Sequence, residues 1–221
     1  MDAPERAAAL GAVAAEAQDC VRCPLAEGRT QVVFGEGNPD AELVLVGESP
    51  GFHEDREGAP FAGRGRDLLD RLLSSVGLAL DETYRATVLK CRPPGNRDPL
   101  PSETAACEPY LYRQLELVQP TVVATLGSFA TALLSGRALG ITRVHGEEQL
   151  VTLGGRTLIL YPLFHPAAAL YTPTMLEALE RDLTRLPALL SRSEPVTTEP
   201  CISIDAPVAP TAREPVQLGL F

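Results

Sequence analysis

Four of the five cysteines are spaced in a way that is typical of metal or cluster ligands. Cys20 and Cys23 form a C-x2-C pair, and Cys91 and Cys107 follow much later in the chain. Thiolates bind zinc or iron–sulfur clusters, and four of them complete either site. The wide second pair favours a cluster over a zinc ribbon. Buried apolar cysteines are the alternative, but their basic neighbours argue against it. Cys201 lies apart and is interpreted as a spare thiol.

The chain alternates short apolar runs with amphipathic segments. Because strands that alternate with helices form a mostly parallel sheet, the predicted fold class is α/β. The expected strands are 42–46, 86–89, 121–125 and 158–163, and the expected helices are 4–18, 64–76, 102–117, 128–134 and 173–190.

Polar and glycine-rich segments follow three of these strands. Residues 47–51 (GESPG) come after the first strand, 90–98 after the second, and His165 after the fourth. Sites in open α/β sheets lie at the carboxyl ends of the strands. The sequence therefore predicts a functional site at this edge.

Composition divides the chain into a folded part, 1–190, and a tail, 191–221, which is rich in Pro, Thr, Ser and Glu and is predicted to be disordered. We expect no membrane span, a cytoplasmic location and a monomer. The net charge of −10 disfavours nucleic acid as a partner, but residues 85–99 carry a local charge of +3 that can bind phosphates.

Three segments together resemble the family 4 uracil-DNA glycosylases. They are GESPGFHEDREGAPFAGRGRDLL at 47–69, KCRPPGNRDPLPSETAAC at 90–107 and FHPAAAL at 164–170. The resemblance implies a three-layer αβα sandwich around a four-stranded, mostly parallel sheet, and excision of uracil from DNA. It also implies a [4Fe–4S] cluster held by the four cysteines Cys20, Cys23, Cys91 and Cys107, and an active site that includes Glu48, Phe61 and His165.

The chain departs from the family pattern at two places. Thr87 stands where the family often has an asparagine that pairs with the uracil edge, and a hydroxyl offers fewer hydrogen bonds than an amide. The segment 167–172 lacks the arginine of the commoner HPSxLLR pattern and with it one phosphate contact.

The residues suggest how a flipped uracil would be bound and cleaved. Phe61 is the expected stacking platform, with a core phenylalanine as the alternative. A neutral His165 would donate a hydrogen bond to a uracil carbonyl. Glu48 would orient water or stabilise the sugar cation, or else would hold the turn through backbone N–H groups. Asp55 is a weaker candidate for binding water.

Other residues are expected to contact the base or the DNA. We expect the backbone of Gly47, Ser49 and Gly51 to approach the base closely, because the two glycines of this segment have no side chains. We expect Lys90, Arg92 and Arg97 to bind phosphates and Ala167 to lie against DNA. We expect Leu170 to enter the space that the base leaves.

The last residues, Gln217, Leu218, Gly219, Leu220 and Phe221, resemble the QLxLF peptide that binds the bacterial sliding clamp. Two alternatives to a uracil-DNA glycosylase remain at this point. One is a glycosylase for a wider range of deaminated bases, and the other is a non-catalytic, clamp-tethered protein that binds damaged DNA.

Overall fold

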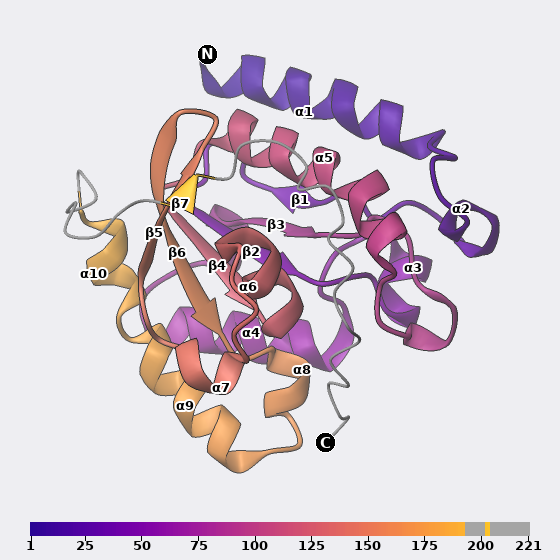
Figure 1. Ribbon diagram of the computed structural model, residues 1–221. Helices are drawn as coiled ribbons and strands as arrows, with labels where there is room; N and C mark the ends of the chain where they lie inside the picture. Colours follow the sequence, from indigo (N-terminus) through magenta and orange to yellow (C-terminus); the bar gives the residue numbers. More distant parts are fainter. Residues whose placement is uncertain (193–201, 204–221) are drawn as a thin grey trace.

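The protein is built around one mixed sheet of seven strands. The computed structural model describes residues 1–192 and 202–203. The strand order is β1-β3-β2-β4-β6-β5-β7 (Figure 1). The strands are β1 (Glu36–Gly37), β2 (Leu43–Gly47), β3 (Tyr84–Thr87), β4 (Val122–Leu126), β5 (Gln149–Leu153), β6 (Arg156–Leu163) and β7 (Ile202–Ser203).

The four predicted strands form the parallel centre of this sheet. β3, β2, β4 and β6 are mutually parallel, whereas β1 and β5 pair antiparallel at either side and β7 pairs parallel to β5. The α/β fold class is therefore confirmed, and three additional strands extend the sheet at its edges.

Helices cover both faces of the sheet. α1 (Ala3–Gln18), α5 (Pro101–Val118) and α6 (Ser128–Ser135) pack on the face that carries Val44 and Val46. α4 (Gly63–Ser75), α9 (Pro173–Leu183) and α10 (Leu186–Leu190) pack on the face that carries Leu43 and Leu45 (Figure 1). Successive side chains of a strand point to opposite faces, so the side chains of β2 are buried on both faces of the sheet. The three-layer arrangement is confirmed.

Short helical segments lie in the connections. They are α2 (Leu25–Gly28), α3 (Phe52–Glu57), α7 (Ile141–Val144) and α8 (Pro166–Ala169), with 3₁₀ turns η1 (Leu80–Glu82) and η2 (Pro94–Asn96). Of these, α3 and α8 follow the carboxyl ends of β2 and β6. They therefore bring their residues to the edge of the sheet where the sequence places the site.

Most predicted elements are shifted by one or two residues, and two of the differences have a clear structural basis. The helix expected over 173–190 is two helices, because Pro187 has no N–H to donate and its ring would clash with the carbonyl of residue 183. The strand expected over 86–89 runs from Tyr84 to Thr87, and the next two residues still donate to the carbonyls of Gly47 and Glu48.

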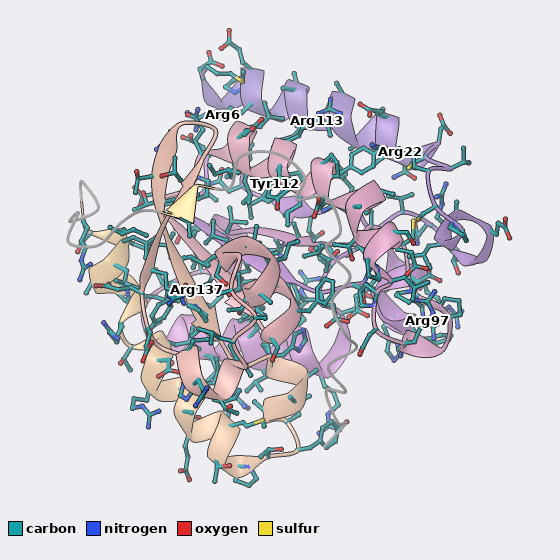
Figure 2. All side chains as sticks on the ribbon, viewed as in Figure 1. Arg6, Arg22, Arg97, Tyr112, Arg113 and Arg137 are labelled. Atoms are coloured by element: carbon teal, nitrogen blue, oxygen red, sulfur yellow. The ribbon has the colours of Figure 1, made fainter. Side chains whose placement is uncertain are left out.

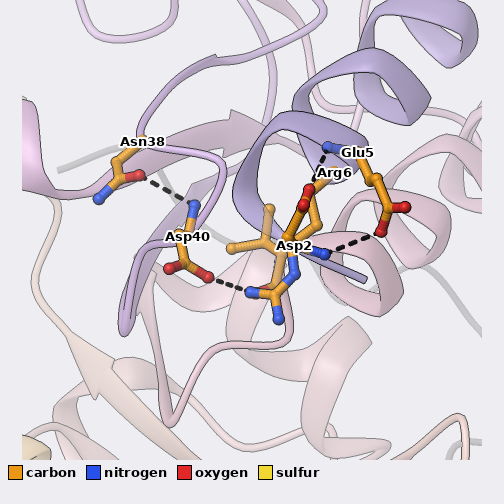
Figure 3. Close-up of polar contacts among 6 residues, drawn as sticks. Asp2, Glu5, Arg6, Asn38 and Asp40 are labelled. Atoms are coloured by element: carbon orange, nitrogen blue, oxygen red, sulfur yellow. Dashed lines mark hydrogen bonds and ion pairs between the residues drawn. The ribbon is translucent and has the colours of Figure 1, made fainter.

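The N-terminal helix is fixed at its beginning by polar contacts. Asp2 and Glu5 cap each other's backbone N–H groups, each at 2.9 Å, and Arg6 forms an ion pair with Asp40 in the loop before β2 (Figure 3). Asn38 in turn accepts a hydrogen bond from the Asp40 N–H at 2.9 Å. These contacts fix α1 on the fold and so position the first cysteine pair at its other end.

The predicted disordered tail lies largely outside the described residues, which include only the two residues of β7 beyond position 192. Within the described part of the chain, no helix is both long enough and apolar enough to cross a membrane.

Candidate active site

The carboxyl edge of the parallel strands brings together the segments that the sequence singles out. Gly47 ends β2 and lies opposite Thr87, the last residue of β3. His165 follows β6 by two residues, and Gly127, directly after β4, donates to the carbonyl of Leu163 at 2.9 Å. The convergence follows from the parallel order of β3, β2, β4 and β6, since their carboxyl ends meet at one edge.

The ring of Phe61 lies against the backbone of Gly47. A Cβ atom at position 47 would come within 3.0 Å of that ring and within 3.4 Å of the Thr87 methyl group, so a larger residue would displace the ring. The side chain of Phe61 is only 7% exposed, yet its backbone has φ +56°, a strained value for a non-glycine residue. Phe61 is therefore both part of the apolar cluster on this face and held in a strained pose at the strand end.

Glu54 holds the loop that carries Phe61, a role that the sequence analysis missed. Its carboxylate accepts the N–H of Gly51 at 3.0 Å and that of Ala62 at 2.7 Å, so it ties the start of α3 to the residue after Phe61. The sequence contains a signal for this role. Glu54 lies three residues after Gly51, which is the N3 position of a helix whose N-cap is the glycine, and a glutamate at N3 often accepts the N-cap N–H.

His165 caps the short helix α8 through one of its two ring nitrogens. Its Nδ1 accepts the Ala167 N–H at 3.1 Å. In the neutral ring the proton therefore resides on Nε2, which is free to donate. Burial lowers the pKa of His165, and the nearby Glu54 carboxylate only partly opposes this. The imidazole is consequently a neutral donor at neutral pH.

Glu48 is a half-buried carboxylate directly after β2. Burial, together with the charge of Asp98, raises the pKa of Glu48 to about 7. Among the described residues its carboxylate has no hydrogen bond, while Glu54 takes the backbone N–H groups of this loop. The turn-holding alternative for Glu48 is therefore not supported. Asp55 accepts the Thr30 N–H at 2.9 Å and is buried, so it serves the loop rather than water.

Thr87 lies at the site, but its hydroxyl is engaged. It donates to the carbonyl of Leu89 at 2.7 Å and is 3% exposed. The hydroxyl proton is thus used within the protein, which leaves only acceptor capacity toward a base. Ser49 and Gly51 are half-buried in the same loop as Glu48.

The prediction that Lys90 binds phosphate is wrong. The side chain is 2% exposed, and its Nζ donates to the Thr87 carbonyl at 2.7 Å and to Gln114 Oε1 at 2.6 Å. Burial lowers the pKa of Lys90 to about 7. Lys90 joins the end of β3 to α5 as a buried polar link, and a charge pattern in sequence cannot distinguish such a lysine from an exposed one.

The two predicted arginine contacts differ in their surroundings. Arg97, which is labelled in Figure 2, forms a two-pronged ion pair with Glu103, at 2.9 and 2.6 Å, beside the start of α5. That pair neutralises its charge within the protein. Arg92 binds Asn96 Oδ1 at 2.7 Å and lies 5.1 Å from the centre of the exposed Phe52 ring, so its charge is not paired with a carboxylate. Of the two arginines, only Arg92 has a charge that no carboxylate of the described residues neutralises.

The residues after His165 cover the apolar face beside the site. Ala167 is exposed, whereas Leu170 is half-buried and packs against the cluster that contains Phe61. Ala167 thus remains open to a partner, while Leu170 has only part of its side chain free to enter a DNA strand.

The four predicted cysteine ligands gather at one place beside α5. Cys91 and Cys107 are each 7% exposed, and Cys20 and Cys23 pack against the same apolar cluster. All four are free thiols. The Lys90 N–H donates to the Cys107 sulfur at 3.1 Å, and Arg29 donates to the Cys91 sulfur at 3.6 Å. In the described residues no three Cys, His, Asp or Glu side chains are close enough together for a single metal ion.

Comparisons with known proteins identify the family of this chain. Residues 34–186 match the family model described as the uracil DNA glycosylase superfamily. The type-4 uracil-DNA glycosylase of Sulfurisphaera tokodaii is 40% identical over 176 residues, which cover 77% of this chain and 80% of that protein.

Two further type-4 uracil-DNA glycosylases show comparable similarity. That of Archaeoglobus fulgidus is 40% identical over 190 residues, which cover 84% of this chain and 96% of that protein. That of Thermotoga maritima is 44% identical over 156 residues, which cover 70% of this chain and 80% of that protein. The chain therefore belongs to the type-4 uracil-DNA glycosylases of the uracil-DNA glycosylase superfamily.

Proposed function

We propose that this protein removes uracil from DNA by hydrolysing the bond between the base and its sugar, leaving an abasic site. The observation that carries the proposal is the placement of Phe61 and His165 together at the carboxyl edge of the sheet, with ring centres 6.2 Å apart. A flat aromatic surface next to a neutral hydrogen-bond donor fits a flat base with carbonyl oxygens. Uracil must leave the helix to reach such a site.

His165 supports departure of the base. As the glycosidic bond breaks, negative charge develops on a uracil carbonyl oxygen, and the Nε2–H of a neutral imidazole can donate to it. The Nδ1 contact with the Ala167 N–H fixes which nitrogen carries the proton and how the ring is turned. No proton has to be transferred for this stabilisation.

Glu48 supports attack of water on the sugar. Its carboxylate is half-buried and lacks a hydrogen-bond partner within the described protein, and its pKa of about 7 is close to the working pH. A base with such a pKa is ionised in about half of the molecules at neutral pH and still accepts a proton readily. Its negative charge also stabilises the cation-like sugar.

The four cysteines fit a [4Fe–4S] cluster. The donor set is four free thiols, and two N–H groups donate to two of the sulfurs, as thiolate ligands of a cluster would require. When bound, such a cluster would crosslink the end of α1 to the loop after β3 and to α5. About four iron atoms and four sulfides per folded chain are expected, with strong visible absorption; a colourless protein that contains zinc would contradict the assignment.

Release of uracil is the direct test of the function. A fluorescent single strand with one uracil is incubated with the protein and then heated in alkali, which cuts only at an abasic site. We expect cutting at the uracil and loss of cutting with His165→Ala. Strands with inosine, xanthine or thymine test the wider-range alternative, and absence of any cutting by the wild type would favour the non-catalytic DNA binder.

We further propose that Gln217, Leu218, Leu220 and Phe221 bind a bacterial sliding clamp. These residues lie outside the described part of the chain, and the proposal is supported by their match to QLxLF at the C-terminus. A synthetic peptide of the last residues should compete with the whole protein for the clamp, and Leu220→Ala with Phe221→Ala should abolish binding. Equal clamp binding by that double variant would contradict the proposal.

A further inference from the structure

Two exposed aromatic side chains stand on the two loops that carry the site. Phe52 directly follows Gly51 and is 46% exposed, and Tyr171 directly follows Leu170 and is 76% exposed. In the part of the chain that the structure describes, every other phenylalanine or tyrosine is buried or half-buried. Single exposed apolar side chains are normal on a protein surface, so the case for these two rings depends on their place beside the site and on their neighbours.

Three arginines reach these two rings: Arg56 from the same helix as Phe52, and Arg92 and Arg64 from other segments. The guanidinium carbons of Arg56 and Arg92 lie 5.5 and 5.1 Å from the centre of the Phe52 ring, and that of Arg64 lies 5.9 Å from the centre of the Tyr171 ring. These distances are within the range of attraction between a cation and an aromatic face. Each exposed ring is therefore part of an aromatic–arginine pair.

The charges of these three arginines are not neutralised inside the protein. Other arginines, such as Arg97, Arg113 and Arg192, pair with carboxylates. Among the described residues, Arg56, Arg64 and Arg92 form no ion pair, although the chain carries a net charge of −10. Three guanidinium groups that stand beside exposed rings and lack a carboxylate partner in the described part of the chain can bind an anionic group.

We propose that Phe52 with its two arginines, and Tyr171 with Arg64, are stacking platforms for the unpaired nucleotides on either side of the uracil. This inference rests on the proposed function. A nucleotide has a flat base that stacks on an aromatic ring or a guanidinium plane, and a phosphate that binds a cation. Bases inside a duplex have both faces covered by their neighbours, so the platforms select an unstacked strand.

The second platform replaces a contact that the sequence lacks. Tyr171 stands at the arginine position of the HPSxLLR pattern, so the positive charge expected there is absent from its own segment. The start of α4 lies against the start of α8, since a Cβ atom at Gly65 would be 3.8 Å from the Ala167 Cβ. This approach lets Arg64 bring a guanidinium to the same place from another helix.

Binding to modified single strands tests the platforms directly. The strands carry one 2′-fluoro-deoxyuridine, whose electron-withdrawing fluorine resists cleavage, and a base-free spacer at the nucleotide before it, after it, or at neither place. For the wild type, each spacer should weaken binding by about 5- to 100-fold, as expected for the loss of one stacked base. Phe52→Ala should abolish the effect of one spacer, and Tyr171→Ala should abolish the effect of the other.

Matched variants exclude a general loss of structure. Phe52→Tyr and Tyr171→Phe keep a ring and should keep both spacer effects. Arg64→Ala should weaken binding and reduce its salt dependence. Arg71→Ala, which is exposed seven residues further along the same face of α4, is the control that should do neither.

The proposal is overturned if spacers weaken the alanine variants as much as the wild type, or if they do not weaken wild-type binding at all. If the spacers weaken binding but the protein releases no uracil, the proposed function is contradicted and the stacking platforms are supported. If the protein releases uracil but the spacers do not weaken binding, the proposed function is supported and the platforms are contradicted.

Discussion

The ring of Phe61 lies 6.2 Å from the imidazole of His165, and the two planes are inclined by 41°. The two residues come from the loop after β2 and the loop after β6, which are separated in the sheet by β4. A base lying on Phe61 would therefore have its edge next to His165. The following predictions depend on this relationship and on the groups that hold it in place.

Replacing the ring of Phe61 should weaken catalysis without removing it. Phe61→Leu keeps an apolar side chain in the cluster but loses the flat surface, so kcat/KM for uracil release should fall by about 5- to 100-fold. Phe61→Tyr should retain most of the activity. Wild-type activity in Phe61→Leu would show that Phe61 is only a core residue.

His165 has two roles that different substitutions separate. His165→Ala removes both the donor and the helix cap, so uracil release should fall by at least about 100-fold and stability by about 1 kcal/mol. His165→Asn keeps a capping side chain and should restore the melting temperature but not the rate. Equal melting temperatures for the wild type and both variants would contradict the capping role.

The activity should depend on pH through Glu48. Because burial and Asp98 raise the pKa of Glu48 to about 7, the carboxylate becomes protonated as the pH falls below that value, and kcat/KM should fall with it. Asp98→Asn removes a negative charge, so the pKa of Glu48 should drop and the acid limb should move to lower pH. Asp81→Asn, an exposed change near the start of β3, serves as the control. An unmoved limb in Asp98→Asn would count against Glu48 as the titrating group.

Glu54 should act as a positioning residue through the loop that it ties. Glu54→Gln leaves an amide that can accept only through its single oxygen, so it cannot hold the N–H groups of Gly51 and Ala62 as the carboxylate does. We expect kcat to fall by about 10-fold or more, because misplacement of a bound group is costly. Glu57→Gln, exposed on the same helix, should not change the rate. Faster proteolysis of the loop in Glu54→Gln alone would support the positioning role.

Lys90 and Arg92 should differ in their effect on the salt dependence of DNA binding. Arg92→Ala should reduce the slope of log Kd against log salt by about 0.7, the value for one single-strand phosphate contact. Lys90→Met should leave the slope unchanged and instead lower the melting temperature, because Gln114 and the Thr87 carbonyl lose their donor. A reduced slope in Lys90→Met would instead show that the Lys90 amine contacts DNA phosphate in the wild type.

Much of the architecture follows from the sequence. The four parallel strands are short apolar runs, and parallel strands buried on both faces have that composition. The two-residue Gly154-Gly155 turn joins β5 to β6 with both φ values positive, at 56° and 78°, which is a hairpin signal that the sequence analysis did not use. Such local signals can be read directly, because they depend on the residues at the turn itself.

What the sequence determined by itself is which residues are candidates for chemistry: the cysteine pairs, the turn with Glu48, and His165 before a proline. Only the tertiary structure decided how each is used. In the structure Lys90 is buried against α5, and Arg97 is paired with Glu103. Glu54 holds the loop after β2, and Arg92 and Arg64 lie beside exposed rings. The physical reason is that burial and charge pairing depend on neighbours from distant segments. A basic residue is therefore a buried link in one place and an unpaired surface charge in another.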